Sequence, residues 1–495
     1  MAIDPVFNSV RISEKTTAET QVKTECKTEI PSDVVSKVID VSAFCGGADY
    51  TVEDGVKISG TVIFNVIYIT ADGKTAKYEC AQEFSQNLPD DVEGKTFLPF
   101  VKVEKAAADV SGTRLTVYAV LKVGGDIIGV KETPYLSGGE GIIADVKEVS
   151  VAKSSGVKKS TFPIEEEIVF PFEVAEVLSQ QAKVVLTDVQ CGVGTIIVDG
   201  EAVVSVLLLQ NSENGDIIKE EKTFPFRFEL ECDEAMPVNT ATATASVKSV
   251  RSDISVDTST GKSTADVLIA VNVSGEAVVS ENVNLFNDAF SETENTALTW
   301  GQAAYSFPCG IKSTKKAVSG KCAVSVPTGA IIVAVIDEKA ETVSVKTESG
   351  ISLQCVYSAK AIYKDADGKI GSITLEIPVE YGEEKGDWDF AEVVATAVSG
   401  KARYISEGET ELSGEAIITA TYYKSEKLKF VSGIESTGVK PVCDAAISVY
   451  IPIEGEGLFS LAKRLNVNPE KLLETNKELN FPLSGKERIV VYRQK

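Results

Sequence analysis

The sequence predicts a mainly β protein, with three tandem antiparallel, sandwich-like domains and a small strand–helix–helix–strand unit at the C-terminal end. Three observations support this prediction. Apolar and polar residues alternate along segments such as 56–68, and helical patterns are scarce before residue 458. A strand-and-turn segment recurs three times, at a spacing of about 150 residues. Residues 445–495 instead combine two short helical patterns with two short strands.

The segment 56–68 shows the strand pattern most clearly. Its apolar residues would share one face, because successive side chains of a strand point to opposite sides. The segment ends in Ala71-Asp72-Gly73-Lys74, which is typical of a tight hairpin turn. The residues of the apolar face are Val56, Ile58, Val62, Phe64, Val66 and Tyr68.

This arrangement is repeated along the chain. Residues 351–363 alternate in the same way and end in the turn Ala366-Asp367-Gly368-Lys369, and a weaker copy leads from Val198 to Asn214-Gly215. Extended segments lie before and after each copy. We therefore predict three domains at residues 1–150, 151–303 and 304–444, each a sandwich or a pair of small antiparallel sheets.

The C-terminal unit begins with a short strand at Ser448–Ile453 and a glycine-rich turn. A first helix would follow, and Asn468-Pro469 provides a cap and first turn for a second helix. A strand at Ile489–Tyr492 ends the unit. The apolar residues expected on the two helices are Leu458, Leu461, Ala462, Leu465, Leu472 and Leu473.

This order of elements resembles the LysM domain, a small module that binds N-acetylglucosamine polymers or, in some members, other proteins. The usual Gly-Asp-Thr opening is Gly455-Glu456-Gly457 here, so a helix-capping hydroxyl is missing, and the closing Ile-Pro is Val491-Tyr492. The residues at the positions expected for the family are Tyr450, Ile453, Gly455, Leu458, Leu461, Ala462, Leu472, Asn476, Gly485 and Ile489.

The LysM resemblance implies a ligand groove between the strand–helix turn and the loop after the second helix. Glycines there would let a ligand approach the backbone closely, and Phe459 and Phe481 would offer an apolar platform. Alternatively, leucines and one phenylalanine simply fill the small core. We expect Asn476 to satisfy local backbone groups. The candidate groove residues are Gly455, Glu456, Gly457, Leu458, Phe459, Asn480, Phe481, Pro482 and Leu483.

Three such β units and a LysM-like tail resemble the SPOCS domain proteins of endospore-forming Firmicutes, in particular the SipL-type spore coat morphogenetic proteins of clostridia. The matching segments are VKISGTVIFNVIYITADGK (56–74) and ISLQCVYSAKAIYKDADGK (351–369). The resemblance implies a non-enzymatic scaffold in the mother-cell cytoplasm at the forespore surface. Its partner would be the ATPase that forms the basement layer of the coat, or another coat protein.

Two other function classes remain open. One is a protein whose LysM-like unit binds peptidoglycan or N-acetylglucosamine oligomers. The other is a homo-oligomer that builds filaments or shells through exposed strand edges. The start MAIDPVFNSV lacks the basic and apolar regions of a signal peptide, so we expect a cytoplasmic protein. Apolar runs such as 203–209 are shorter than the ~20 residues of a membrane span.

Composition narrows the partners and the chemistry. The net charge of −24 disfavours nucleic acids and anionic membranes. The chain contains no histidine, which excludes Ser-His-Asp and Cys-His catalysis and histidine-ligated metals. The cysteines form no CxxC pair, and we expect free thiols in a reducing compartment. They are Cys26, Cys45, Cys80, Cys191, Cys232, Cys309, Cys322, Cys355 and Cys443.

Local patterns that suggest enzymatic or metal chemistry fit loops better. Gly261-Lys262-Ser263 lacks the glycine at 256 that a phosphate-binding loop requires. Asp365-Ala366-Asp367-Gly368 would place Tyr363 and Thr374 at the first and twelfth positions of a calcium loop. Runs of glutamate such as 165–167 suit a solvated face. We therefore assign no catalytic residue, cofactor or metal ligand, and we expect no enzymatic activity.

Overall fold

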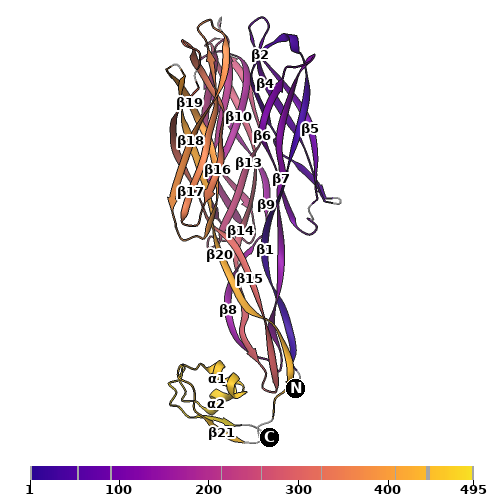
Figure 1. The fold of residues 1–495 in the computed structure, drawn as a ribbon, viewed down its shortest axis with the longest axis vertical. Coiled ribbons are helices and arrows are strands. Elements are labelled where there is room, and N and C mark those ends of the chain that lie inside the picture. Colours follow the sequence, from indigo (N-terminus) through magenta and orange to yellow (C-terminus); the bar gives the residue numbers. More distant parts are fainter. Residues whose placement is uncertain are drawn as a thin grey trace.

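The computed structural model describes residues 3–52, 55–89, 92–212, 215–257, 259–324, 326–406, 408–441 and 446–492. Three β-sandwiches lie side by side above a narrow stalk, and a small helical unit lies at the far end of the stalk (Figure 1). The N-terminus lies at that end too (Figure 1). The predicted mainly β fold with three antiparallel units is confirmed.

Sandwich 1 consists of two sheets. The first has the order β1-β7-β6, and in the second β4 pairs with β5 on one side and with β2 and β3 on the other. A short 3₁₀ turn, Ser32–Val34, connects the first two strands. The strands are β1 (Asp4–Pro31), β2 (Val35–Phe44), β3 (Asp49–Val52), β4 (Val56–Thr70), β5 (Thr75–Leu88), β6 (Thr96–Asp109) and β7 (Arg114–Glu140).

Sandwich 2 repeats this plan, except that its first strand is divided into β8 and β9, which both pair with β14. Its second sheet has the order β10-β11-β12. The strands are β8 (Ile143–Ser154), β9 (Lys158–Phe170), β10 (Val174–Cys191), β11 (Thr195–Gln210), β12 (Ile217–Glu231), β13 (Thr240–Asp257) and β14 (Lys262–Phe290).

Sandwich 3 repeats the plan again, with sheets β15-β20-β19 and β16-β17-β18. Its strands are β15 (Glu294–Cys322), β16 (Ile331–Lys346), β17 (Gly350–Lys364), β18 (Ile370–Glu384), β19 (Phe390–Ser406) and β20 (Glu409–Val439). In all three sandwiches, therefore, the first strand pairs with the last. The predicted threefold repetition is thus a repetition of one strand order.

Each sandwich buries its own core between its two sheets, as the alternation predicts. Ile58 and Phe64 of β4 are fully buried in sandwich 1, and Tyr357 of β17 is fully buried in sandwich 3. The predicted turns are also present: the Gly73 N–H donates to the Thr70 carbonyl at 2.9 Å, and both Gly73 and Gly368 have positive φ. Asn214 of the middle turn lies outside the described residues.

The predicted domain boundaries at 150–151 and 303–304 fall inside β8 and β15. The chain passes between sandwiches at residues 141–142 and 291–293 instead. The first and last strands of each sandwich continue beyond its core as a paired ribbon. The chain therefore passes to the next repeat at the far end of the ribbon, away from the core of the sandwich. The remaining boundary, 444–445, lies outside the described residues.

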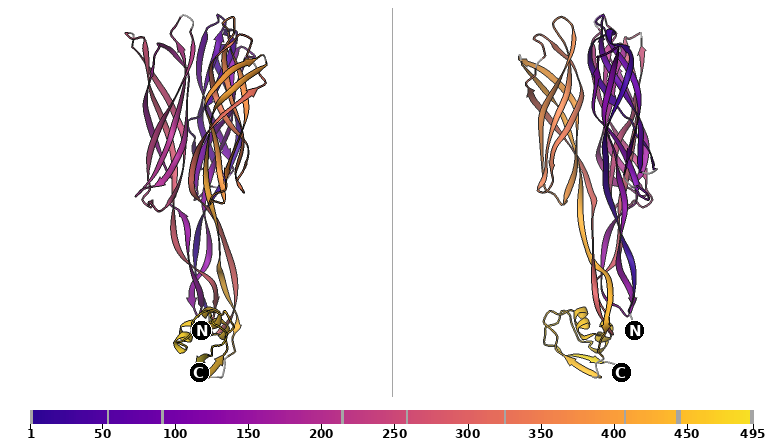
Figure 2. Two further views of the ribbon diagram at one scale, coloured as in Figure 1. Left: turned by 90° about the vertical axis from the view of Figure 1, so that its left-hand side faces the viewer. Right: turned by 45° about the vertical axis from the view of Figure 1, so that its right-hand side comes forward.

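These ribbons form the stalk. Residues 4–15 pair with 128–140, residues 143–154 with 278–290, and residues 294–308 with 423–439. The ribbons run down together from the sandwiches in both views of Figure 2. Apolar side chains from all three ribbons meet between them and bury the interior of the stalk. The fully or mostly buried ones are Val10, Ile12, Tyr135, Leu136, Val151, Leu285, Phe286, Ala289, Ala303, Tyr305, Leu428, Phe430, Val431 and Ile434.

The sandwiches contact each other head to tail. The residue four positions after each turn glycine donates a hydrogen bond to the next sandwich. Lys77 Nζ donates to the Val177 carbonyl at 2.9 Å, Lys219 Nζ contacts the Glu338 carboxylate, and Ser372 Oγ donates to the Ile39 carbonyl at 2.7 Å. The acceptors lie at β-bulges in β10, β16 and β2. A β-bulge bends its strand and changes the direction in which its groups point, so in all three contacts a bulge presents the acceptor to the neighbouring sandwich.

A second set of contacts strengthens two of these interfaces. Asn65 Nδ2 donates to the Leu178 carbonyl at 2.9 Å, and Lys360 Nζ contacts the carboxylate of Asp40, which is only 2% exposed. An apolar cluster from all three sandwiches lies beside these contacts. It comprises Ile39, Ile67, Leu178, Leu207, Ile217, Ala334, Ile336 and Ile362.

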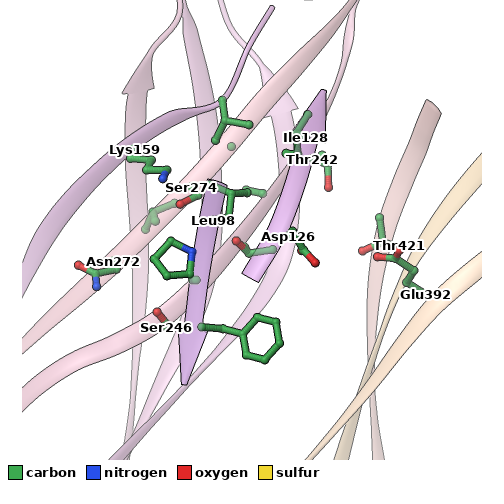
Figure 3. Close-up of a pocket in the computed structure, with 18 of the residues that line it drawn as sticks. Leu98, Asp126, Ile128, Lys159, Thr242, Ser246, Asn272, Ser274, Glu392 and Thr421 are labelled. Carbon is green, nitrogen blue, oxygen red and sulfur yellow. The ribbon is translucent and has the colours of Figure 1, made fainter. Parts of the chain in front are cut away.

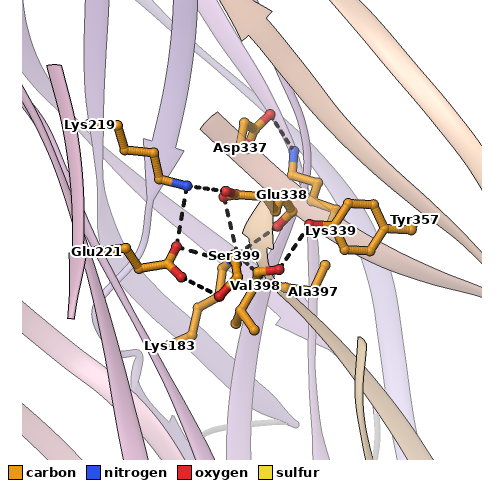
Figure 4. A network of polar contacts seen from close by, with 10 residues as sticks. All are labelled: Lys183, Lys219, Glu221, Asp337, Glu338, Lys339, Tyr357, Ala397, Val398 and Ser399. Atoms are coloured by element: carbon orange, nitrogen blue, oxygen red, sulfur yellow. Dashed lines mark hydrogen bonds and ion pairs between the residues drawn. The ribbon is translucent and has the colours of Figure 1, made fainter. Parts of the chain in front are cut away.

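The interface of sandwiches 2 and 3 contains a buried polar network (Figure 4). Lys183 Nζ donates to the carbonyls of Glu338 and Ala397, at 2.7 and 2.8 Å. Burial lowers the pKa of Lys183, although the nearby Glu338 opposes this shift. Burial also opposes the ionisation of Glu221, but the hydrogen bond from Ser399 and the charge of Lys219 leave its pKa lowered. Both charged groups are therefore held by partners across the interface.

The C-terminal unit has the predicted order of elements: β21 (Ile447–Tyr450), α1 (Leu458–Leu465), α2 (Pro469–Thr475) and β22 (Ile489–Tyr492). β21 and β22 pair antiparallel. Leu461, Ala462 and Leu472 are buried between the helices and the sheet, as their spacing predicts. The α-helices of the described residues, α1 and α2, have eight and seven residues, too few for a membrane span.

Breaking the Lys360–Asp40 contact should destabilise the chain. Lys360→Met leaves a buried carboxylate without its partner, which typically costs about 3–5 kcal/mol of unfolding free energy. Burial raises the pKa of Asp40. When folding raises the pKa of a carboxyl, the folded protein loses stability as the pH rises. The cost of Lys360→Met in unfolding free energy should therefore be larger at about pH 7 than at about pH 5. Denaturant unfolding at both pH values measures this difference.

The control is the double variant Asp40→Leu/Lys360→Met, which removes both charges and should recover most of the lost stability. An equal loss at both pH values, or a double variant less stable than Lys360→Met, would contradict the assigned role of this pair.

The core of the C-terminal unit should depend on Leu461. Leu461→Ala should cost about 2–5 kcal/mol, because it leaves a cavity in a very small core. Hydrogen exchange of residues 458–475 in the full-length chain should rise, while exchange in the sandwiches stays unchanged. The matched control is Leu473→Ala, because Leu473 is 37% exposed on α2. Unchanged exchange in the Leu461 variant would show that the helix packs differently.

Candidate functional site: the C-terminal unit

The start of α1 shows how the altered opening sequence is accommodated. Gly457 is the N-cap residue, and its N–H donates to Ser460 Oγ at 3.1 Å. Ser460 therefore satisfies the N–H of the N-cap residue, which is one half of a capping box, and Gly457 has no side chain to make the other half. Glu456 binds Arg464 of α1 through both oxygens, at 2.8 and 2.7 Å, and accepts the Ile453 N–H at 3.0 Å. The hydrogen bonds from Arg464 lower the pKa of Glu456.

The structure brings together the two loops that would border the groove. Gly455 N–H donates to the Leu483 carbonyl at 2.8 Å, and Leu483 N–H donates to the Glu456 carbonyl at 3.0 Å. Gly455 has a φ of +82°, a conformation that favours glycine. The loops are therefore joined to each other by backbone hydrogen bonds, and these backbone groups are already paired.

Most candidate groove residues contribute to the unit itself. Leu483 is 2% exposed, and Leu458, Phe459 and Phe481 are half-buried against the core. The Glu456 carboxylate is held by Arg464, and Gly457 caps α1. Gly455, Asn480 and Pro482 remain exposed along the joined loops.

Asn476 has the role expected from the sequence. Its Nδ2 donates to the carbonyls of Leu472 and Val490 at 2.8 and 2.7 Å, and its Oδ1 accepts the Val490 N–H at 2.8 Å. The side chain therefore ties the end of α2 to β22.

The unit is docked on the end of the stalk. Lys463 of α1 forms an ion pair with Asp288 of β14, at 2.6 and 2.7 Å from its two carboxylate oxygens. Phe459 packs edge-on against Phe290, with ring centroids 5.5 Å apart, and Phe290 is 1% exposed. Phe459 therefore helps to hold the unit on the stalk, a role that the local sequence pattern does not reveal.

β21 and the segment after it carry an exposed apolar row. Ile447, Val449, Ile451 and Ile453 alternate along β21 and the segment after it, and they are 58%, 61%, 71% and 62% exposed. Tyr492 of β22 pairs with Ile447 and is 62% exposed. We call Ile447, Val449, Ile451 and Ile453 the aliphatic row, and Tyr492 lies beside it. The alternation is visible in the sequence, but sequence alone does not show which face of the strand stays uncovered.

A second candidate site is a central cavity of about 1790 Å³ between the three sandwiches. All three contribute to its lining, for example Leu98 of sandwich 1, Ser246 of sandwich 2 and Thr421 of sandwich 3 (Figure 3). The residues Cys45, Gly46 and Gly47, which interrupt the strand between β2 and β3, also line it. A Cβ at Gly46 would overlap the Lys248 carbonyl of sandwich 2, so only glycine fits there.

Several charges in the cavity are paired within the protein. Lys15 Nζ lies 3.1 Å from Asp126 and 3.8 Å from Glu392 of sandwich 3. Burial opposes the charge of Lys15, but Glu392 and Asp126 leave its pKa raised. Thr17 donates to Asp126 at 2.7 Å and Tyr423 to Glu392 at 3.1 Å. These contacts stabilise the packing of the sandwiches and leave these carboxylates hydrogen-bonded.

In the part of the chain that the structure describes, the cavity lining contains no histidine, and no group of three or more His, Cys, Asp or Glu side chains is placed to hold a metal ion. The chemistry that the geometry does support is binding, through the apolar surface of the C-terminal unit.

Comparisons with known proteins identify part of sandwich 2. No curated protein and no solved structure matches the chain significantly. One segment, residues 173–255, does match a family model. It begins just before β10 and ends within β13, so it spans four consecutive strands of sandwich 2. Residues 173–255 match the family described as "SipL, SPOCS domain".

Proposed function

We propose that the chain is a non-enzymatic scaffold protein of spore envelope assembly. The match of residues 173–255 to the SPOCS domain of SipL supports a role related to the spore coat. The other two sandwiches share the strand order of this one. In the proposal, the three sandwiches and the stalk form a rigid body, and the C-terminal unit binds the partner.

The aliphatic row is the observation that carries the choice of a protein partner. An exposed apolar patch of this kind typically marks a protein interaction site. Branched aliphatic side chains have no hydrogen-bonding groups, whereas sugar hydroxyls require them. The joined loops reinforce this choice, because their facing backbone groups already bond to each other. The unit, with its LysM-like order, is therefore proposed to bind a protein in preference to a glycan.

The SipL-type resemblance suggests which protein to test. In that family the partner is the ATPase of the coat's basement layer, which acts at the forespore surface in the mother cell. A stalk that presents the unit at one end of an elongated molecule suits this role, because it leaves the sandwiches free to contact other coat proteins (Figure 2). The location and the partner are proposals that rest on this resemblance.

Charged substitutions in the aliphatic row should weaken partner binding. Val449→Asp and Ile451→Asp should each weaken the affinity for the purified ATPase by about 2 kcal/mol or more, roughly thirtyfold, since each puts a charge into an apolar contact. The dissociation constant is measured by passing soluble ATPase over the surface-immobilised full-length chain. Val238→Asp is the matched control, because Val238 is 91% exposed on sandwich 2, away from the unit.

Phe481→Ser and Phe459→Asp are less specific tests than the row variants, because Phe481 packs against the core and Phe459 against Phe290.

The unmodified full-length protein should also be sedimented with purified peptidoglycan. Strong sedimentation that N-acetylglucosamine oligomers compete away, without affinity for the ATPase, would contradict the proposal and favour a wall-binding protein.

A further inference from the structure

Sandwich 1 brings two cysteines from distant parts of the sequence into contact. Cys26 lies on β1 and Cys80 on β5, and both side chains pack against the core of sandwich 1. Cys26 Sγ also lies 4.0 Å from the carbonyl oxygen of Ala81. Nearby on the same two strands, the Glu29 N–H donates to the Tyr78 hydroxyl at 3.2 Å. These contacts fix β1 and β5 side by side at the thiol pair.

The pair lies at a seam of the fold. β1 is an edge strand of one sheet of sandwich 1, and β5 is an edge strand of the other. Both cysteines are half-buried, as are Cys45 and Cys309, so a small molecule has access to them, whereas Cys191, Cys232, Cys322 and Cys355 are buried. A bond between Cys26 and Cys80 would join the two sheets directly.

We propose that Cys26 and Cys80 form a reversible disulfide when the protein meets a small-molecule disulfide such as oxidised glutathione. Cys26 Sγ lies 4.0 Å from the carbonyl oxygen of Ala81, the residue after Cys80, so the two strands already hold the two cysteines side by side, as a disulfide requires. The site would therefore report the redox state of its surroundings.

The exchange takes place in two steps that balance. The Cys26 thiolate attacks one sulfur of the oxidant, which forms a mixed disulfide and releases one glutathione thiolate. Cys80 then loses its proton to solvent and attacks the Cys26 sulfur, which releases the second glutathione. Two electrons pass from the cysteine pair to the oxidant, and two thiols of glutathione are formed.

The thiol chemistry fits this order of attack. Burial, and next the contact with Cys26, raise the pKa of Cys80 to about 12. Cys80 therefore keeps its proton as long as Cys26 carries no glutathione. Capping Cys26 in the mixed disulfide removes the contribution of that neighbouring thiol, so Cys80 ionises more readily in the second step.

The bond would stabilise a sandwich whose second sheet has a divided strand. In sandwiches 2 and 3 the first strand of the second sheet is continuous, whereas in sandwich 1 it is divided into β2 and β3. A disulfide that closes a long loop restricts the unfolded chain and stabilises the folded one. The oxidised protein should therefore unfold at a higher denaturant concentration than the reduced protein.

The test is to incubate the reduced full-length protein with oxidised glutathione and digest it with trypsin under non-reducing conditions. The expected product is a cross-link between peptides 24–27 and 78–95, with the mass loss of two hydrogen atoms, which dithiothreitol reverses. The denaturant midpoint of the oxidised protein should rise. A Cys26 that carries glutathione without forming the cross-link would overturn the proposal.

Two variants make the result specific. Cys80→Ser should trap the glutathione adduct on Cys26 and abolish the rise in the midpoint. Cys355→Ser removes a buried thiol of sandwich 3 and should leave the cross-link intact. A cross-link that involves other cysteines, or a midpoint that rises equally in the Cys80→Ser variant, would also overturn the proposal.

Discussion

The head-to-tail contact between sandwiches is the constraint on which the rest of the structure depends. A contact that joins two different surfaces either closes into a ring or continues as an open array. Here the contact from Lys77 to sandwich 2 is repeated from Lys219 to sandwich 3 and from Ser372 back to sandwich 1. The three sandwiches therefore close into a ring, in which the donor and acceptor surfaces of every sandwich are occupied by its neighbours in the same chain.

Several other features follow from this closure. The first and last strands of the three sandwiches are brought close together, so their extensions can bury apolar side chains against one another as a stalk. The cavity is the space that the three sandwiches leave between them. Because the stalk is assembled from all three repeats, its end is a defined platform, on which Asp288 and Phe290 hold the C-terminal unit.

Much of the fold could be predicted from the sequence. Alternation between Val56 and Tyr68 identified a buried strand, and the turn glycines identified the repeats, because these signals depend on neighbouring residues. The helices of the C-terminal unit were predicted for the same reason. The predicted domain boundaries fall inside β8 and β15, because the pairing of β8 with the far end of β14 is a long-range contact without a local signal.

The candidate site was predicted only in part. The two loops do meet, at Gly455 and Leu483, but the sequence does not show that they are joined by hydrogen bonds. Phe459 has the spacing of a core or groove residue, and its contact with Phe290 depends on docking. The aliphatic row is visible as an alternating strand, but its exposure depends on which face the helices cover. The same limit applies to Cys26 and Cys80, which only the packing of two sheets brings together.

The most direct test of this account is a set of distances between the three repeats. Lys74, Asp216 and Lys369 follow the three turn glycines and are exposed. Spin labels placed on them in pairs, in a variant without native cysteines, allow pulsed electron resonance to measure the three separations. A closed ring predicts three similar distances. A separation between 74 and 369 close to the sum of the other two would indicate an open row and contradict the account.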